Sequence, residues 1–491
     1  MEADWTTRHE RLVLLLLCML FLATRLPGLL ALPIFNDEAV YLYRAQRFPA
    51  HLQFTIHDGK FIHELLLAAL VHLPWDPLLV GRIMSVLCGW LTVTGLWLSG
   101  RVIGDPSVGL FAGVLYICSP LAIVHDRLAI PDAMLGSMAS FLLAASLRLT
   151  ALPQPNRWHA AGVGALTALA ALVKLPGLFL FALPALFIIA TQPASLANRP
   201  RRRALFRTAL IVTLLAPAAF APFNYGGAEN HKVGALGVDH QIERALSGVC
   251  QMSEWLALTL PLPTLALVGF GLILPRTRRF ALTLTAAACL FCLTLAGIGS
   301  VLYPRYILPV WPMLLLVAGL SVRHLGDFSR SARYAGIAVL SLLVVWGVTF
   351  AAQYASDPAR APLTAIDRRQ YIESWTAGYN LPDIYAALRA HAAERGAIIV
   401  ISPIHERVIH FGPAIYLRND SRISFINVDF RDNRAGMQIA DIAAHRPVYL
   451  TLDAEEVVAF DIERRFPELK RIREWRNPHS AMAFYLYAWS P

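Results

Sequence analysis

Long apolar stretches alternate with short polar connections over roughly the first 350 residues. About 20 consecutive apolar residues suffice for one helical membrane crossing. A further apolar stretch, at residues 60–75, is too short and too rich in His and Glu to cross, and we expect it to lie at the membrane interface. The pattern predicts eleven candidate spans, at residues 11–32, 78–98, 107–124, 130–150, 158–173, 176–191, 204–224, 255–274, 280–301, 307–320 and 334–350.

The pattern changes to that of a soluble module after about residue 351. A charged amphipathic segment at 381–395 is followed by short β-rich runs at 397–402, 424–428, 448–452 and 483–487. Alternating helix and strand patterns are typical of a small α/β domain. The sequence therefore predicts two domains, a transmembrane domain over residues 1–354 and an α/β domain over residues 355–491.

The composition strengthens the membrane interpretation. Hydrophobic residues make up 56% of the 491 positions, and charged residues only 15%, against about 25% in a soluble globular domain. Residues 12–23 are short enough for the core of a signal peptide, but no small-x-small cleavage site follows them cleanly. We therefore exclude an ordinary soluble enzyme and predict an α-helical polytopic membrane protein that keeps its first span.

The positive charge predicts an orientation and excludes one class of partner. The formal net charge is +10, but the basic residues lie in short connections and form no patch with interleaved aromatics, which argues against nucleic acid. With a cytoplasmic N-terminus, the arginine-rich connections face the cytoplasm, as the positive-inside rule requires. Eleven crossings then place the C-terminal domain on the extracytoplasmic face of the inner (plasma) membrane.

Two adjacent carboxylates, Asp37 and Glu38, follow the first span directly. A carboxylate fixed at the water interface can take a proton from an incoming hydroxyl. In an equally open interpretation, Asn36 or Asp37 caps the following helix and Glu38 interacts with its dipole. The two interpretations are compatible.

Three cations lie near the ends of apolar stretches. Lys60 precedes the interfacial stretch, Arg82 opens the second span, and Lys174 occupies the turn between the fifth and sixth spans. Each can hold a lipid phosphate at that depth, whereas the alternative is a long side chain that simply reaches to the interface.

Two further turns carry ionisable groups. Asp126, Arg127 and Asp132 lie in or beside the turn between the third and fourth spans, and Arg305 and Tyr306 lie before the tenth. As an alternative, Asp126 and Arg127 neutralise each other and Asp132 lies in the first turn of a helix. Under the predicted topology all these groups face one membrane surface. Such a mixed cluster is typical of a site where cations bind a lipid-linked phosphate and a carboxylate meets a polar acceptor.

The order of the motifs NDEAVYLY, DGKFIHELLLA, GRIMSVLCG, HDRLAIPDAML, LVKLPG and YPRYILPVWP resembles the GT-C superfamily of polyprenyl-phosphate-sugar-dependent glycosyltransferases. It is most similar to bacterial relatives of protein O-mannosyltransferases and of the lipid A aminoarabinose transferase. The resemblance covers about residues 11–320, and the acidic pair and the RY turn are its more specific parts.

The resemblance implies roles for individual residues. Asp37 is implied to activate the acceptor, with Glu38 supporting it, and Lys60 to bind the donor phosphate, although Phe61 and Ile62 replace the prolines of a GKPPL-like run. The remaining matched positions are implied to line the substrate site: Arg82, Arg127, Asp132, Lys174, Arg305 and Tyr306. Residues 370–383 also resemble a segment that follows the last span of some relatives, without a known role.

The implied reaction is inverting transfer of a monosaccharide from a polyprenyl-phosphate donor to the hydroxyl of an acceptor glycan, lipid or protein. The sequence contains no nucleotide-binding fingerprint, which agrees with a lipid-phosphate donor. No cofactor is predicted. Because oligosaccharyltransferase relatives use a divalent ion, an ion held by Asp37, Glu38, Asp126 and Asp132 stays an open alternative.

Two other functions compete with this prediction. One is an oligosaccharide or polymer-modifying transferase of the same superfamily, which would differ in donor size. The other is a transporter or flippase of lipid-linked sugars, whose charged groups would line a path through the bundle and would not gather at one surface.

Overall fold

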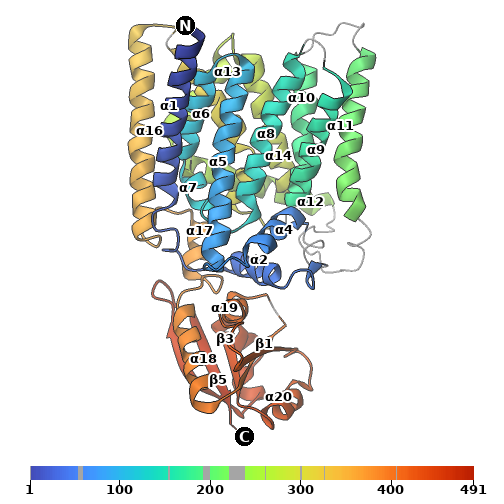
Figure 1. Cartoon of the computed structure of the whole chain (residues 1–491), viewed down its shortest axis with the longest axis vertical. Coiled ribbons are helices and arrows are strands. Elements are labelled where there is room, and N and C mark those ends of the chain that lie inside the picture. Colours follow the sequence, from blue (N-terminus) through green and yellow to red (C-terminus); the bar gives the residue numbers. More distant parts are fainter. Residues whose placement is uncertain are drawn as a thin grey trace.

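The protein is a bundle of long helices with a small α/β module at one end (Figure 1). This computed structural model describes residues 2–52, 59–152, 155–191, 199–220, 238–259, 261–298, 301–325, 327–404 and 406–490. The start of α1 and the sheet of the module lie at opposite ends of the bundle (Figure 1). This arrangement matches the predicted separation of the N-terminus from the C-terminal module.

The bundle confirms the predicted polytopic helical architecture. Among the described residues, α5, α8, α14 and α16 are long and apolar enough to cross a membrane by themselves, and the other helices are shorter or carry more charge. The helices are α1 (Glu2–Arg25), α5 (Pro77–Ile103), α6 (Pro106–Ile117), α8 (Pro131–Ala151), α9 (Arg157–Val173), α10 (Ala182–Thr191), α11 (Arg199–Phe220), α12 (Val238–Thr259), α13 (Leu262–Ile273), α14 (Arg278–Ile298), α15 (Trp311–Leu325) and α16 (Arg330–Ser356).

Prolines interrupt several of the predicted spans. The third span is split, because α6 ends at Ile117 and the short helix α7 (Pro120–His125) begins at Pro120. The eighth span is likewise divided between α12 and α13, which begins after Pro261. Proline lacks an N–H group and disfavours helical backbone at the preceding residue. The sixth and tenth spans begin instead as 3₁₀ turns, η1 (Leu175–Phe181) and η4 (Pro304–Ile307).

Two short helices lie at the end of the bundle that faces the module (Figure 1). They are α2 (Asn36–Gln46) and α4 (Phe61–Leu70), and α4 occupies the stretch predicted to lie at the interface. They pack on each other, with the rings of Tyr41 and His63 in edge contact at 5.4 Å. The connection between α1 and α5 therefore lies next to the module.

The module contains a five-stranded sheet in the order β2-β1-β3-β5-β4. Strand β1 is parallel to β2 and β3, whereas β5 is antiparallel to β3 and β4. The elements after α16 are α17 (Ala365–Arg368), a π-helical turn η5 (Arg369–Glu373), α18 (Leu381–Arg395), β1 (Ile398–Pro403), α19 (Val408–Tyr416), β2 (Ile423–Val428), α20 (Ala435–Ala443), β3 (Val448–Asp453), α21 (Ala454–Ala459), α22 (Ile462–Arg465), β4 (Leu469–Arg476) and β5 (Ala483–Trp489).

The sheet confirms the predicted α/β class, and it contains one strand that the sequence did not predict. Strand β4 reads LKRIREWR and is exposed at five consecutive positions, because it lies at the edge of the sheet. Charged side chains are typical of edge strands, which they protect from pairing with other chains. Its hydrophobic signal is therefore too weak to mark it as a strand.

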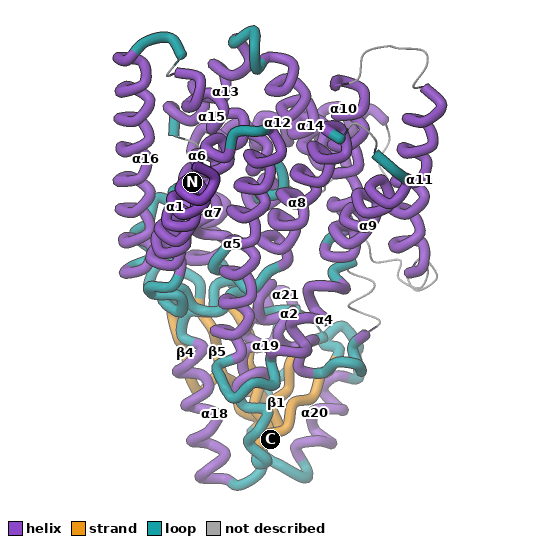
Figure 2. Tube along the Cα trace, turned by 45° about the horizontal axis from the view of Figure 1, so that its top comes forward, coloured by secondary structure: helices purple, strands orange, loops and turns teal. Residues whose placement is uncertain are grey.

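The module packs directly on the interfacial helices. Figure 2 shows the strands below the helix bundle, between α18 and α20. Helix α19 contacts α2, where the rings of Tyr43 and Phe411 are 4.5 Å apart and Arg44 Nη2 donates to Glu406 Oε1 at 2.5 Å. An isolated antiparallel bridge joins Phe35 to Ala377. The loop after α1 and the segment before α18 therefore lie side by side.

Candidate functional site

Glu38 helps to hold the first turn of α2. The N-cap residue is Phe35, whose backbone N–H donates to Glu38 Oε2 at 3.2 Å. Ala129 N donates to Glu38 Oε1 at 2.8 Å. Neither Asn36 nor Asp37 is therefore the capping residue, in contrast to the alternative left open by the sequence.

Arg82 completes the surroundings of Glu38. It forms two parallel bonds to the carboxylate, from Nε to Oε1 at 2.9 Å and from Nη2 to Oε2 at 2.7 Å. Its other N–H groups donate to the carbonyl oxygens of Leu29, Leu32 and Pro33. All five N–H groups of the guanidinium are thus used inside the protein. Because Arg82 is also buried, the structure places it as a support for Glu38 and not in the lining of a substrate site, in contrast to the prediction.

Asp37 faces a different arginine. Arg305 Nη2 donates to Asp37 Oδ2 at 2.8 Å, and the Asp37 side chain keeps 30% of its surface exposed, against 0% for Glu38. Arg305 itself is almost fully buried beneath it. Adjacent residues on one helix therefore have opposite settings, since only the Asp37 carboxylate is open to a molecule from outside.

Arg305 is held by residues that follow the last span. Its Nη1 donates to Gln370 Oε1 at 2.6 Å and to the hydroxyl of Tyr371 at 3.2 Å. Both residues belong to η5 and are buried. Sequence reasoning missed their role, although the segment that begins at Gln370 was noted for its resemblance to relatives.

A second ion pair adjoins the first. Lys174 Nζ donates to Asp132 Oδ1 at 2.6 Å and lies 4.0 Å from the ring centroid of Tyr306. The other oxygen of Asp132 is 3.8 Å from Arg305 Nε. Arg305 therefore lies between the two aspartates, and residues from four separate turns meet as the sequence predicted. We call Asp37, Asp132, Lys174, Arg305 and Tyr306 the charged cluster.

Lys60 lies beside α2, at the beginning of α4. It is the N-cap residue of α4, and its Nζ lies 4.8 Å from the ring centroid of Tyr41. Electrostatic attraction of an ammonium group to a tyrosine face is favourable at such distances. The lysine therefore extends along the interface close to the helix that carries Asp37.

Arg127 lies apart from the charged cluster. Its Nη2 donates to the carbonyl oxygens of Pro27 and Gly28, at 2.6 and 2.7 Å, and its guanidinium lies over the ring of Tyr354 at 4.9 Å. It therefore fixes the turn after α1, where Gly28 has a positive φ of 60°. The predicted place of Arg127 in the lining of the site differs from this geometry.

Asp126 is paired with an arginine other than its neighbour. Arg25 Nε donates to Asp126 Oδ2 at 3.2 Å, and the hydroxyl of Tyr116 donates to Oδ1 at 2.8 Å. The alternative in which Asp126 and Arg127 neutralise each other is therefore wrong.

A divalent ion does not fit these carboxylates as they stand. The four candidates are divided between separate cations, with Asp37 on Arg305, Glu38 on Arg82, Asp126 on Arg25 and Asp132 on Lys174. Within the described part of the chain, no three His, Cys, Asp or Glu side chains are grouped so that they could hold a metal ion.

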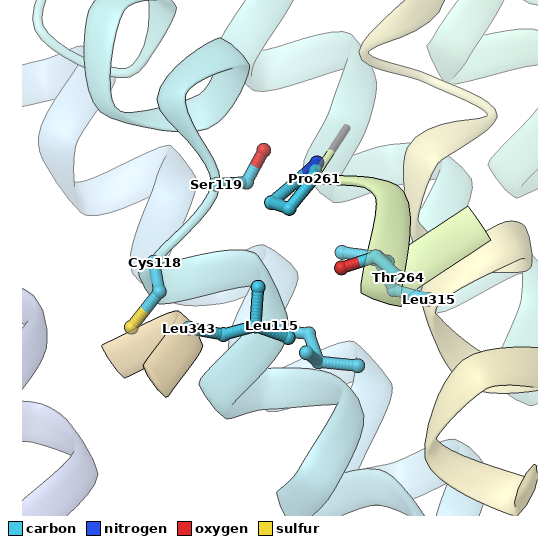
Figure 3. A pocket seen from close by; sticks show the side chains of 7 residues that line it. All are labelled: Leu115, Cys118, Ser119, Pro261, Thr264, Leu315 and Leu343. Atoms are coloured by element: carbon cyan, nitrogen blue, oxygen red, sulfur yellow. The ribbon is translucent and has the colours of Figure 1, made fainter. Parts of the chain in front are cut away.

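A small cavity inside the bundle is unrelated to the charged cluster. Figure 3 shows it beside the break between α6 and α7, and its walls are mostly apolar. None of the predicted site residues contributes to the lining, which consists of Leu115, Cys118, Ser119, Pro261, Thr264, Leu315 and Leu343.

Part of the chain matches one family. The family described as dolichyl-phosphate-mannose-protein mannosyltransferase matches residues 61–224. These residues carry Arg82, Asp132 and Lys174. No curated protein matches the chain by sequence.

The fold is similar to solved structures over nearly the whole chain. The crystal structure of ArnT from Cupriavidus metallidurans bound to undecaprenyl phosphate is 13% identical, with a TM-score of 0.60 over 99% of this chain and 98% of that one. The archaeal oligosaccharyltransferase AglB from Archaeoglobus fulgidus, in complex with an inhibitory peptide and a dolichol-phosphate, is 11% identical, with a TM-score of 0.56 over 99% and 75%. The arabinofuranosyltransferase AftD from Mycobacteria is 13% identical, with a TM-score of 0.52 over 99% and 42%.

Proposed function

We propose that the chain is a membrane glycosyltransferase of the GT-C type, which transfers a monosaccharide from a polyprenyl-phosphate donor to an acceptor hydroxyl with inversion at the anomeric carbon. The observation that carries this proposal is the partly exposed Asp37 carboxylate, held 2.8 Å from Arg305 at the module end of the bundle. Asp37 is the general base in this proposal, and Glu38 and Arg82 fix the helix turn that presents it.

The proposed step needs one base and no nucleotide. Asp37 accepts the proton of the acceptor hydroxyl as its oxygen attacks the anomeric carbon. The bond between that carbon and the phosphate oxygen breaks, and its electron pair leaves with the polyprenyl phosphate. Attack on the face opposite the leaving group inverts the configuration, in the same way as in inverting glycosidases.

Cations at the same end of the bundle stabilise the departing phosphate. Lys60, Lys174 and Arg305 are the candidates, because fixed positive charge near the developing anion lowers the barrier. The solved structures with undecaprenyl phosphate and with dolichol-phosphate support a lipid phosphate as the donor of this chain.

The proposed side of the reaction is the extracytoplasmic face of the inner membrane. The positive-inside bias and the position of the module at the end opposite the start of α1 support this orientation. A transporter would need charged groups along a path through the bundle. The gathering of Asp37, Lys174 and Arg305 at one end therefore favours transfer over transport.

The substitution Asp37→Asn tests the base. Asparagine keeps an oxygen that accepts from Arg305 but cannot take a proton, so transfer should fall by about 10²- to 10⁴-fold. The assay combines purified full-length protein, polyprenyl-phosphate sugars extracted from its native membranes and envelope glycans from cells that lack the protein, with released polyprenyl phosphate measured by mass spectrometry. Donors that carry one sugar or several distinguish monosaccharide transfer from oligosaccharide transfer.

The matched control is Asp383→Asn, which changes an exposed aspartate in the first turn of α18 and should leave the rate unchanged. Both purified variants should have the same melting temperature as the wild type. Wild-type turnover in Asp37→Asn would reject Asp37 as the base, and no release of polyprenyl phosphate by the wild type would reject the proposed function.

A further inference from the structure

A cleft separates the C-terminal half of α2 from the module. Its volume is about 200 Å³, and it lies outside the charged cluster. Tyr43 and Arg44 line it from α2. Ser402, Glu406, Phe425 and Asn427 line it from the module. The cleft is thus shared by the two parts of the protein.

The carboxyl ends of two parallel strands border the cleft. Ser402 in β1 and Asn427 in β2 are register partners near the carboxyl ends of these parallel strands. The connection after β1 leads to β2 on one side, while β3 lies on the other side of β1. Open α/β sheets bind ligands outside the carboxyl ends of their strands, and the cleft lies at that end of β1 and β2. Helix α2 covers that edge here.

The lining combines aromatic faces with neutral hydrogen-bonding groups. The Tyr43 ring packs against Phe411 at 4.5 Å and is covered by the guanidinium of Arg47 at 3.7 Å, so the half-buried Phe425 offers the aromatic face to a ligand. Ser402 and Asn427 both donate and accept hydrogen bonds. An aromatic face binds the apolar side of a sugar ring, and hydroxyl and amide groups bind its rim.

The charged groups of the cleft do not favour an anion. Arg44 lies between two carboxylates, 2.5 Å from Glu406 and 3.5 Å from Glu64. Burial, together with the nearby Arg47 and Arg44, lowers the pKa of His51, so that its ring is neutral at pH 7. An uncharged polar ligand therefore suits this lining better than an anion.

The cleft is aligned with Asp37. Arg44 follows Asp37 by seven residues on α2, so the two side chains lie on one face of the helix, about 10 Å apart along its axis. A short oligosaccharide can span two helical turns. Given the proposed function, we infer that the cleft binds the inner sugar residues of a glycan acceptor and directs its terminal hydroxyl to Asp37.

Photo-crosslinking in native membranes tests which chemistry occupies the cleft. p-Benzoyl-phenylalanine takes the place of Phe425 in the cleft or, as a control, of Met437, which is 73% exposed on α20. Adducts are hydrolysed in acid and analysed for monosaccharides by mass spectrometry. Sugar-bearing adducts at position 425 and not at 437 are expected. Adducts of peptide or lipid without sugar, equal labelling at both positions, or no adduct would overturn the inference.

The labelling is independent of turnover. Repeated in the Asp37→Asn background, it should give the same adducts, because the base does not hold the inner sugars. If that variant transfers sugar normally while position 425 still captures glycan, the proposed base fails and the cleft stands. If transfer is lost in that variant but no glycan is captured, the inference about the cleft fails alone.

Kinetics provide the second measurement. Asn427→Ala should raise the acceptor KM about fivefold through the loss of one hydrogen bond, with kcat and the donor KM unchanged. Met437→Ala is the matched control on the same module. An unchanged acceptor KM, or a change confined to kcat, would contradict a role in binding the acceptor.

Discussion

Asp37 and Glu38 are neighbours on one helix, and each is paired with a buried arginine, yet the two pairs are built differently. Arg82 uses every N–H group on Glu38 and on backbone carbonyls, and the pair is sealed from solvent. The Asp37–Arg305 pair has one carboxylate partly open, and its arginine also borders Asp132. Exposure and unused bonding capacity thus distinguish Asp37, which we propose as the base, from Glu38, which is enclosed in the fold.

The largest effect is expected when the sealed pair is broken. Arg82→Met leaves the Glu38 charge buried without a cation, which should lower the free energy of unfolding by about 3–5 kcal/mol. Thermal unfolding of the detergent-purified protein measures the change. The control is Arg323→Met, because Arg323 forms an exposed pair with Asp105 worth about 1 kcal/mol or less. Equal shifts in the two variants would abolish the distinction between sealed and open pairs.

In the partly exposed pair, Asp37–Arg305, we expect a substitution to lower activity more than stability. Lysine in Arg305→Lys keeps the charge but cannot span Asp37, Gln370 and Tyr371 at once, since it lacks the planar fork. We expect kcat to fall about 100-fold, comparable to the loss of one donor that stabilises a transition state. Steady-state assays on protein of verified melting temperature provide the check. If unfolding of the variant explained the whole loss of activity, the Asp37–Arg305 pair would be structural, like the Arg82–Glu38 pair.

We expect a smaller effect when a residue that holds Arg305 is changed and Arg305 itself is kept. Gln370→Ala removes one buried acceptor of Arg305 and should lower kcat about tenfold, through the loss of about 1–1.5 kcal/mol of hydrogen bonding. Acceptor and donor KM values should stay constant, because Gln370 contacts Arg305 and not the proposed substrates. Gln353→Ala, at an exposed glutamine, is the control. A change in KM alone would contradict a positioning role.

The smallest effect concerns a third pair, in the module. Arg407 Nη1 donates to Asp453 Oδ2 at 2.5 Å, and burial, followed by repulsion from Glu456, raises the pKa of Asp453. A raised pKa means that the folded protein binds this proton more tightly. The stabilisation is therefore complete below the unfolded pKa of about 3.9 and is lost as the pH rises through the folded value.

Melting temperatures between pH 3.5 and 7 measure the pH-dependent stabilisation by Asp453. Asp453→Asn should remove it, so that the melting temperature of the variant falls less with rising pH than that of the wild type. Asp420→Asn is a control of opposite sign, because Arg422 lowers the pKa of Asp420 and stabilises the protein as the pH rises. Parallel pH profiles for Asp453→Asn and the wild type would show that Asp453 does not titrate in this range.

Much of the architecture follows from the sequence, because apolar length and the placement of arginines are strong local signals. The convergence of Asp37, Asp132, Lys174 and Arg305 was also predictable, because the ends of packed spans at one membrane surface lie close together. What the sequence could not distinguish is the use of each arginine. Arg82 and Arg305 have the same chemistry in isolation, and backbone carbonyls distant in sequence decide which is enclosed.

Three features were missed by the sequence analysis, each for its own reason. Gln370 and Tyr371 act through a contact about 65 residues away from Arg305, and their own neighbourhood carries no catalytic motif. Proline positions indicated the helix breaks, but a hydropathy window averages across them. Strand β4 was missed because its charged side chains mask its pairing with β5.

The pairing of Asn36 N with the carbonyl of Thr376, beside the bridge from Phe35 to Ala377, has a consequence for biosynthesis. The ribosome must make more than three hundred residues after Asp37 before Gln370 and Thr376 emerge. A nascent chain therefore inserts nearly all of its helices with the Arg305 fork unsupported, and only the final segment completes it. A chain terminated before residue 370 would lack both residues that hold Arg305 from this segment, Gln370 and Tyr371.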